Sequence, residues 1–188
     1  MRGQWTALTV TLAIQAMVAM AVLTLPVMAP AVAQALGASA AYTGVYVAIV
    51  YAGAMAASLA GGTAVARWGA IRVSQAGLVL CAAGLALCAV PSLAAMALGA
   101  FLIGLGYGPI TPASSHLLAR TTPAHRMSLV FSIKQTGVPL GGVLAGAIVP
   151  GVAVAAGWQG ALLLAAAANL ACALIAQPLR PALDEDRD

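Results

Sequence analysis

Long apolar stretches, joined by short polar or charged connections, fill almost the whole of this 188-residue chain. A helix needs roughly 20 apolar residues to cross a bilayer core about 30 Å thick. Strands are excluded, because the stretches are continuous rather than alternating and an open sheet leaves backbone groups unpaired in lipid. Helices are predicted over residues 6–34, 41–66, 71–90, 93–120, 127–149 and 158–177. The pattern therefore predicts an all-α membrane protein, built as a six-transmembrane-helix bundle.

Basic residues other than Lys134 occur only at alternate connections between these spans. They precede the first span, follow the second, the fourth and the sixth, and are Arg2, Arg67, Arg72, Arg120, Arg126, Arg180 and Arg187. The connections at 37–41, 91–92 and 151–157 hold no charge. Lys and Arg near span ends are retained on the cytoplasmic side. We therefore expect a multi-pass protein of the inner (plasma) membrane with both termini in the cytoplasm.

The acidic residues are confined to the last five positions, as Asp184, Glu185, Asp186 and Asp188. This distribution predicts a bundle over residues 1–180 and a short charged cytoplasmic tail over residues 181–188. An alternative makes the first apolar run a cleaved secretory signal. That run is far longer than the usual signal core of roughly 7–15 residues, so we expect the first helix to remain in the protein.

Composition excludes several other classes of protein. The chain is 63% hydrophobic and 6% charged, whereas a soluble domain is typically about 25% charged. Its net charge of +4 comes from scattered loop arginines without a basic run, so nucleic acid is not an expected partner, whereas membrane lipid is. Cys81, Cys88 and Cys172 lie in apolar stretches without other metal-ligating residues, so neither a metal nor a cofactor is expected.

Enzymatic chemistry has little support in the sequence. Ser114, Ser115 and His116 are consecutive, so they point to different faces of a helix and cannot form a nucleophile–base pair among themselves. No catalytic residue is therefore predicted.

Polar side chains are distributed unequally among the spans. The first span carries Gln15, the fourth carries Tyr107 and Thr111, and the fifth carries Lys134 and Gln135. Polar groups in hydrocarbon need a partner or a water-filled cavity. The first, fourth and fifth helices are therefore predicted to line a pathway, and these five residues are the predicted substrate-binding set. The third and sixth helices, which are poorer in polar groups, can face lipid.

Lys134 is the most informative of these residues. Counted from Arg126 at about 1.5 Å per residue, it lies roughly 12 Å inside the cytoplasmic boundary. An ammonium at that depth marks a substrate or ion site, and its natural guest is a small organic anion such as a carboxylate. In the alternative interpretation, the lysine stem extends along the helix toward the cytoplasmic surface and has no role in binding.

The connection after the second span carries Gly62, Arg67, Gly69 and Arg72, and here the chain resembles the major facilitator superfamily. That family has Gly-x-Leu-x-Asp-Arg-x-Gly and further basic residues at this place. The resemblance implies that these four residues form a gating loop. Ala66 stands where the family has its acid, so an acid-mediated contact at this point is not implied.

Two further segments are similar to the same family. Residues 104–108 resemble the glycine-rich part of its fourth helix, and Gly137, Pro139, Gly141 and Gly142 resemble a Gly-Pro-x-x-Gly-Gly element of its fifth helix. These glycines, together with Gly53, are expected at helix-packing contacts, either within one bundle or between two.

The resemblance implies the fold and activity of one half of a twelve-helix transporter. Such transporters are built from two six-helix halves. We expect a secondary transporter that works by alternating access, either as a homodimer, with a separate second six-helix half, or as a fragment of a longer chain. A non-transporting membrane scaffold remains the alternative from another functional class.

Overall fold

The computed structural model describes residues 2–39 and 41–184, and every regular element in this part of the chain is helical. The elements are α1 (Arg2–Val27), α2 (Ala29–Leu36), α3 (Tyr42–Trp68), α4 (Ala70–Cys88), α5 (Leu93–Tyr107), α6 (Ile110–Thr121), η1 (Ala124–Arg126), α7 (Met127–Gln135), α8 (Gly137–Ala176), η2 (Gln177–Leu179) and α9 (Arg180–Leu183). The predicted all-α fold class is confirmed.

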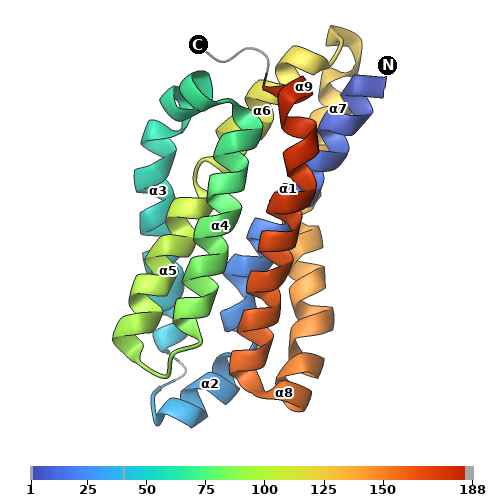
Figure 1. The fold of residues 1–188 in the computed structure, drawn as a ribbon. Coiled ribbons are helices and arrows are strands. Elements are labelled where there is room, and N and C mark those ends of the chain that lie inside the picture. Colours follow the sequence, from blue (N-terminus) through green and yellow to red (C-terminus); the bar gives the residue numbers. More distant parts are fainter. Residues whose placement is uncertain (1, 40, 185–188) are drawn as a thin grey trace.

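The described chain crosses the bundle six times. Five helical segments are long and apolar enough to span a membrane, and the fifth, Ala124–Leu183, contains two crossings. The chain reverses inside α8 at Gly157, whose φ of 75° and ψ of 166° are accessible mainly to glycine. Figure 1 shows the two limbs of α8 side by side, and the start of α1 at the same end of the bundle as α9. The six-helix prediction is therefore confirmed.

Three of the predicted spans are broken rather than continuous. The first breaks at Met28 between α1 and α2, the fourth at Gly108 and Pro109 between α5 and α6, and the fifth at Thr136 between α7 and α8. Proline follows each break within a few residues and lacks the N–H that would continue the helical hydrogen bonds. The broken fourth and fifth spans carry most of the predicted substrate-binding residues.

Close contact between helices depends on small residues. The helix α1 packs mainly on α8, α4 packs on α5 and α8, and α3 packs on α5. A Cβ atom at Gly104 would collide with the Val50 carbonyl, and one at Gly53 would come within 2.7 Å of the Phe101 carbonyl. The backbones of α3 and α5 can therefore approach only because these positions lack side chains.

The third helix exposes one face, which includes Ala76, Val79 and Ala83, and this face can meet lipid. Most of α4 is buried between α5 and α8, and Gln75 Nε2 donates hydrogen bonds to the Ala173 carbonyl at 2.9 Å and to Gln177 Oε1 at 2.8 Å. Low polarity within a span does not distinguish a lipid-facing helix from one enclosed by apolar neighbours. The sixth crossing does expose one apolar face, which includes Leu174 and Ile175.

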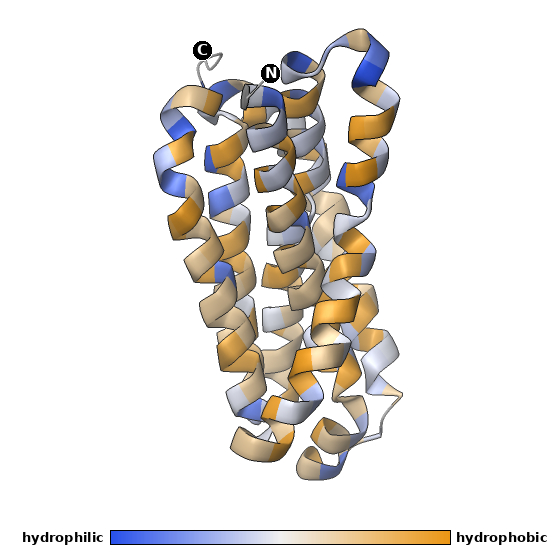
Figure 2. Ribbon diagram, turned by 90° about the vertical axis from the view of Figure 1, so that its right-hand side faces the viewer, coloured by the Kyte–Doolittle hydropathy of each residue, from blue (hydrophilic) through white to orange (hydrophobic). Residues whose placement is uncertain are grey.

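Hydrophilic residues gather at the end of the bundle where the two termini lie, while the middle is largely apolar (Figure 2). Part of the predicted tail belongs to the bundle, because Leu183 and Asp184 are 5% and 2% exposed. The bundle thus extends to residue 184, beyond the expected boundary at 180. The other acidic residues of that tail, Glu185, Asp186 and Asp188, lie outside the described residues.

Candidate functional site

Lys134 lies in the last turn of α7 and is only 2% exposed. Its Nζ donates a hydrogen bond to Gln135 Oε1 at 3.5 Å, and no acidic side chain of the described residues pairs with it. Burying an ammonium without a counter-charge is costly. The side chain is enclosed by neighbouring parts of the bundle in this conformation.

Gln15 lies on α1 opposite the start of α8. A Cβ atom at Gly137 would come within 2.9 Å of Gln15 Cβ, so the absence of a side chain there makes room for the glutamine. Gln15 is 1% exposed, and its Oε1 has no hydrogen-bond partner within the described structure. Gln15 and Lys134 thus place two poorly satisfied polar groups close to the α7–α8 break.

Tyr107 and Thr111 lie elsewhere, in a groove of about 380 Å³ between α3 and the α5–α6 break. The ring of Tyr107 packs edge-on against Tyr51, with centroids 6.4 Å apart. Met55 and Ser58 also line the groove. Its walls offer phenol and hydroxyl groups but no charge.

The α5–α6 break has a specific partner on α3. The carbonyl of Gly108 would normally accept a hydrogen bond from the N–H four residues later, but that residue is Pro112. Ser58 Oγ donates a hydrogen bond to this carbonyl instead, at 3.0 Å. A side chain from a neighbouring helix thus satisfies a backbone group that the proline leaves free.

The predicted substrate-binding residues therefore form two groups. Gln15, Lys134 and Gln135 lie around the α7–α8 break, with Gln135 itself exposed. Tyr107 and Thr111 lie beside the α5–α6 break with Tyr51 and Ser58, which the sequence analysis did not select. Ser58 donates a hydrogen bond to a carbonyl that a proline leaves without its helical partner. This role cannot be recognised from the sequence, because it depends on knowing that α3 packs beside the α5–α6 break.

The residues predicted to form a gating loop lie at or near the turn from α3 into α4. Arg67 and Arg72 are exposed. The guanidinium carbon Cζ of Arg67 lies 5.9 Å from the centre of the Trp68 ring. Gly69 adopts a φ of 88°, which favours glycine, and it is buried. Gly62 has open space beside it. An acid does reach this loop, although it comes from Asp184 rather than from the motif.

The predicted packing glycines make contacts within the chain. Gly53 lies against α5, while Gly137 and Gly141 lie against α1. Gly142 approaches Leu23, and Pro139 is exposed. The space beside each of the three buried glycines is already filled by another helix of the same bundle. These glycines therefore do not offer a free surface to a second chain.

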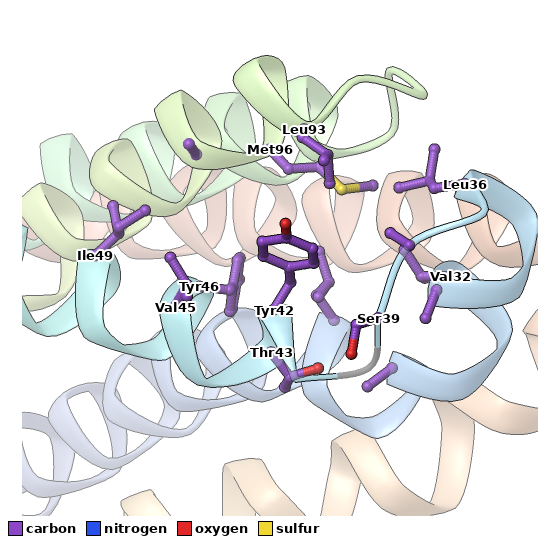
Figure 3. A pocket seen from close by; sticks show the side chains of 15 residues that line it. Val32, Leu36, Ser39, Tyr42, Thr43, Val45, Tyr46, Ile49, Leu93 and Met96 are labelled. Atoms are coloured by element: carbon purple, nitrogen blue, oxygen red, sulfur yellow. The ribbon is translucent and has the colours of Figure 1, made fainter.

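An apolar cavity of about 220 Å³, which the sequence analysis missed, is lined by side chains of α1, α2, α3 and α5 (Figure 3). It forms where α2 turns away from α1 over the starts of α3 and α5. Val32, Leu36, Tyr42, Tyr46, Leu93 and Met96 contribute to its wall. The wall carries no charged side chain, so it does not suit an anion.

Comparison with known proteins agrees with this architecture. A scan against protein-family models matches the Major Facilitator Superfamily over residues 10–187. A search of curated proteins finds no match. The family match covers nearly the whole chain, and the six crossings correspond to one six-helix half of that architecture. The chain therefore belongs to the major facilitator superfamily.

Proposed function

We propose that this chain, a secondary transporter by family, moves a small organic anion such as a carboxylate by alternating access. The observation that carries the proposal is the burial of Lys134 without a counter-charge in the described residues. An uncompensated cation attracts an anion, and the nearby amide of Gln15 adds hydrogen-bonding capacity. The bound anion would supply the negative charge that no described side chain provides for Lys134.

Access to Lys134 requires movement, because its side chain is enclosed in this conformation. The α7–α8 break at Thr136 supplies a hinge beside it. Binding sites of secondary transporters lie near the bilayer centre at discontinuous helices. The α5–α6 break, which borders the Tyr107 groove, provides a second hinge.

We further propose that a second copy of the chain completes the transporter. The two halves of these transporters are related by an axis along the membrane normal, and a twofold pair of identical chains meets that requirement. The exposed apolar residues Met55 and Leu59 on α3 and Val143 on α8 support this assembly, since such faces need lipid or another protein. The localisation proposed is the inner membrane, with both termini in the cytoplasm.

The test is uptake of radiolabelled acetate, lactate and succinate into proteoliposomes, with glycerol as a neutral probe. Lys134→Gln keeps much of the side-chain bulk and removes the charge, so anion uptake should fall at least about tenfold, as expected for the loss of a charged hydrogen bond. Lys134→Arg should restore only part of it, because a planar guanidinium does not reproduce an ammonium. Arg126→Gln removes an equal charge at the start of the same segment and should leave uptake intact.

Mixing wild type with Lys134→Gln in equal amounts tests the dimer. If both lysines of a pair are needed, uptake should fall to about one quarter, because only that share of random dimers is fully wild type. A fall to about one half indicates independent monomers. Undiminished anion uptake by the Lys134→Gln variant alone contradicts the anion assignment, and absence of uptake of any probe by wild type favours the scaffold function.

A further inference from the structure

One exposed side of α7 carries polar residues. Ser128, Ser132 and Gln135 are exposed and follow one another at intervals of four and three positions, which places them on the same side of the helix. Val130 and Lys134 lie on another side and are buried in the bundle. The helix α7 therefore carries an enclosed lysine on one side and, on the other, a row of exposed polar groups, Ser128, Ser132 and Gln135, which we call the polar face.

The depth of the polar face makes contact with lipid unfavourable. Ser132 lies six positions beyond Arg126, which corresponds to about 9 Å along the helix. A serine or threonine at such a depth can donate a hydrogen bond to a carbonyl of its own helix. Thr136 does so, at 2.6 Å from the Ile133 carbonyl, whereas the Ser132 side chain has no hydrogen-bond partner among the described residues. Its hydroxyl therefore needs water or a solute beside it.

Gln135 connects the polar face with the enclosed lysine. Its Oε1 accepts the hydrogen bond from Lys134 Nζ at 3.5 Å. Hydrogen bonds between nitrogen and oxygen are usually about 2.9–3.0 Å long, so this contact is weak. A carboxylate is a stronger partner for an ammonium than a neutral amide is, because both groups are then charged. An arriving anion can therefore take the place of the Gln135 amide oxygen.

We propose that the polar face of α7 lines the route by which the solute reaches Lys134, and that the Gln135 amide occupies the place of the anion until the anion arrives. The inference rests on the proposed function, because the anion is the solute named there. The polar face is exposed, so the route runs along the outside of this six-helix unit and requires no separation of its helices. Gln135 is itself exposed, so its displacement does not disturb the core.

The first measurement is the rate at which single cysteines react with an anionic, water-soluble methanethiosulfonate in the purified full chain, reconstituted in lipid nanodiscs. The native cysteines are replaced by alanine. Leu174→Cys is the matched control, because Leu174 is 73% exposed and lies six positions from Arg180, as Ser132 does from Arg126. A thiol that faces lipid stays protonated and reacts slowly, so Ser132→Cys and Gln135→Cys should react at least about tenfold faster than this control. Equal rates overturn the route, whether lipid or a second chain covers the face.

The second measurement is the KM for uptake into proteoliposomes of whichever anion, acetate, lactate or succinate, the wild type takes up fastest. Gln135→Leu keeps much of the side-chain bulk and removes the competing oxygen, so the KM should fall at least about threefold. Gln135→Glu supplies a permanent counter-charge beside Lys134 and should reduce uptake at least about tenfold. Gln34→Glu, the same change at an exposed position of α2, should leave uptake intact. An unchanged or higher KM in Gln135→Leu, or wild-type uptake by Gln135→Glu, overturns the displacement of Gln135.

Failure of this route and failure of the proposed function give different results. Loss of uptake in Lys134→Gln together with slow labelling of Ser132→Cys supports the proposed function and overturns the route. Fast labelling of Ser132→Cys together with undiminished uptake by Lys134→Gln supports the route and contradicts the anion assignment.

Discussion

Single glycines decide how closely the helices of this protein approach. At Gly141 a Cβ atom would lie within 2.6 Å of Ala19 Cβ and 2.7 Å of the Met20 backbone nitrogen, whereas at Gly146 nothing lies within 4 Å. Both residues are in the same limb of α8, five positions apart. Their different surroundings arise from which face of α8 meets α1.

Gly141→Ala should therefore destabilise the protein, and Gly146→Ala should not. The added methyl at position 141 has to displace the backbone of α1, and overpacking of this kind costs about 1–3 kcal/mol. At position 146 the methyl meets open space, so the unfolding midpoint should stay unchanged or rise slightly. Unfolding of the two variants in detergent, followed by helical circular dichroism, compares them directly. Equal losses would show that α8 and α1 are not in close contact.

At the scale of elements, the helix breaks are stabilised by neighbouring helices. Proline explains where the hydrogen bonds of a span are interrupted, and this could be expected from the sequence. The group that compensates for the interruption could not, because Ser58 lies 50 positions before Gly108 along the chain. The stability of the α5–α6 break therefore depends on α3 as well as on the fourth crossing itself.

A double-mutant cycle tests this arrangement. Ser58→Ala leaves the Gly108 carbonyl unsatisfied and should cost about 0.6–2 kcal/mol. Pro112→Ala supplies the missing N–H, so adding Ser58→Ala in that background should cost close to nothing. The exposed hydroxyl of Thr63 on the same helix provides the control substitution, Thr63→Ala, with no expected effect in either background. Additive losses in the unfolding free energy would contradict the proposed exchange of hydrogen-bond donors.

At the scale of the whole molecule, the division of the connections into charged and uncharged ones corresponds to the two ends of the bundle. The arginine-bearing connections lie at the end of the bundle that holds both described chain ends, and the uncharged connections lie at the other (Figures 1 and 2). The orientation of the bundle in the membrane is a prediction from the arginines, since Lys and Arg near span ends are retained on the cytoplasmic side.

Single cysteines report this orientation. A cysteine at Ser39 or Ser92 should react with a membrane-impermeant maleimide added outside intact cells, and one at Ala124 should react only after the cells are opened. Ser39 and Ala124 are both exposed, so a difference between them reflects the side of the membrane rather than burial. Labelling of Ala124 from outside would reverse the proposed topology.

The sequence by itself determined the number of crossings, the helical class and the family motifs. These properties are local: a run of apolar residues is long enough to span a bilayer, or it is not, whatever its neighbours are. The resemblance carried by Gly62, Arg67, Gly69 and Arg72 agrees with the family match over residues 10–187. The predicted depth of Lys134 likewise rests on counting residues along one helix.

Only the tertiary structure decided which surfaces those helices present to one another. It buried most of α4 although its composition suits lipid, and it placed Tyr107 and Thr111 in a groove that neither Lys134 nor Gln15 lines. It also brought Asp184 to the loop whose own motif lacks an acid, across 113 positions of sequence. The physical reason is the same in each case: packing and hydrogen bonding join residues that are distant in the chain, and a pattern read along the chain does not contain those distances.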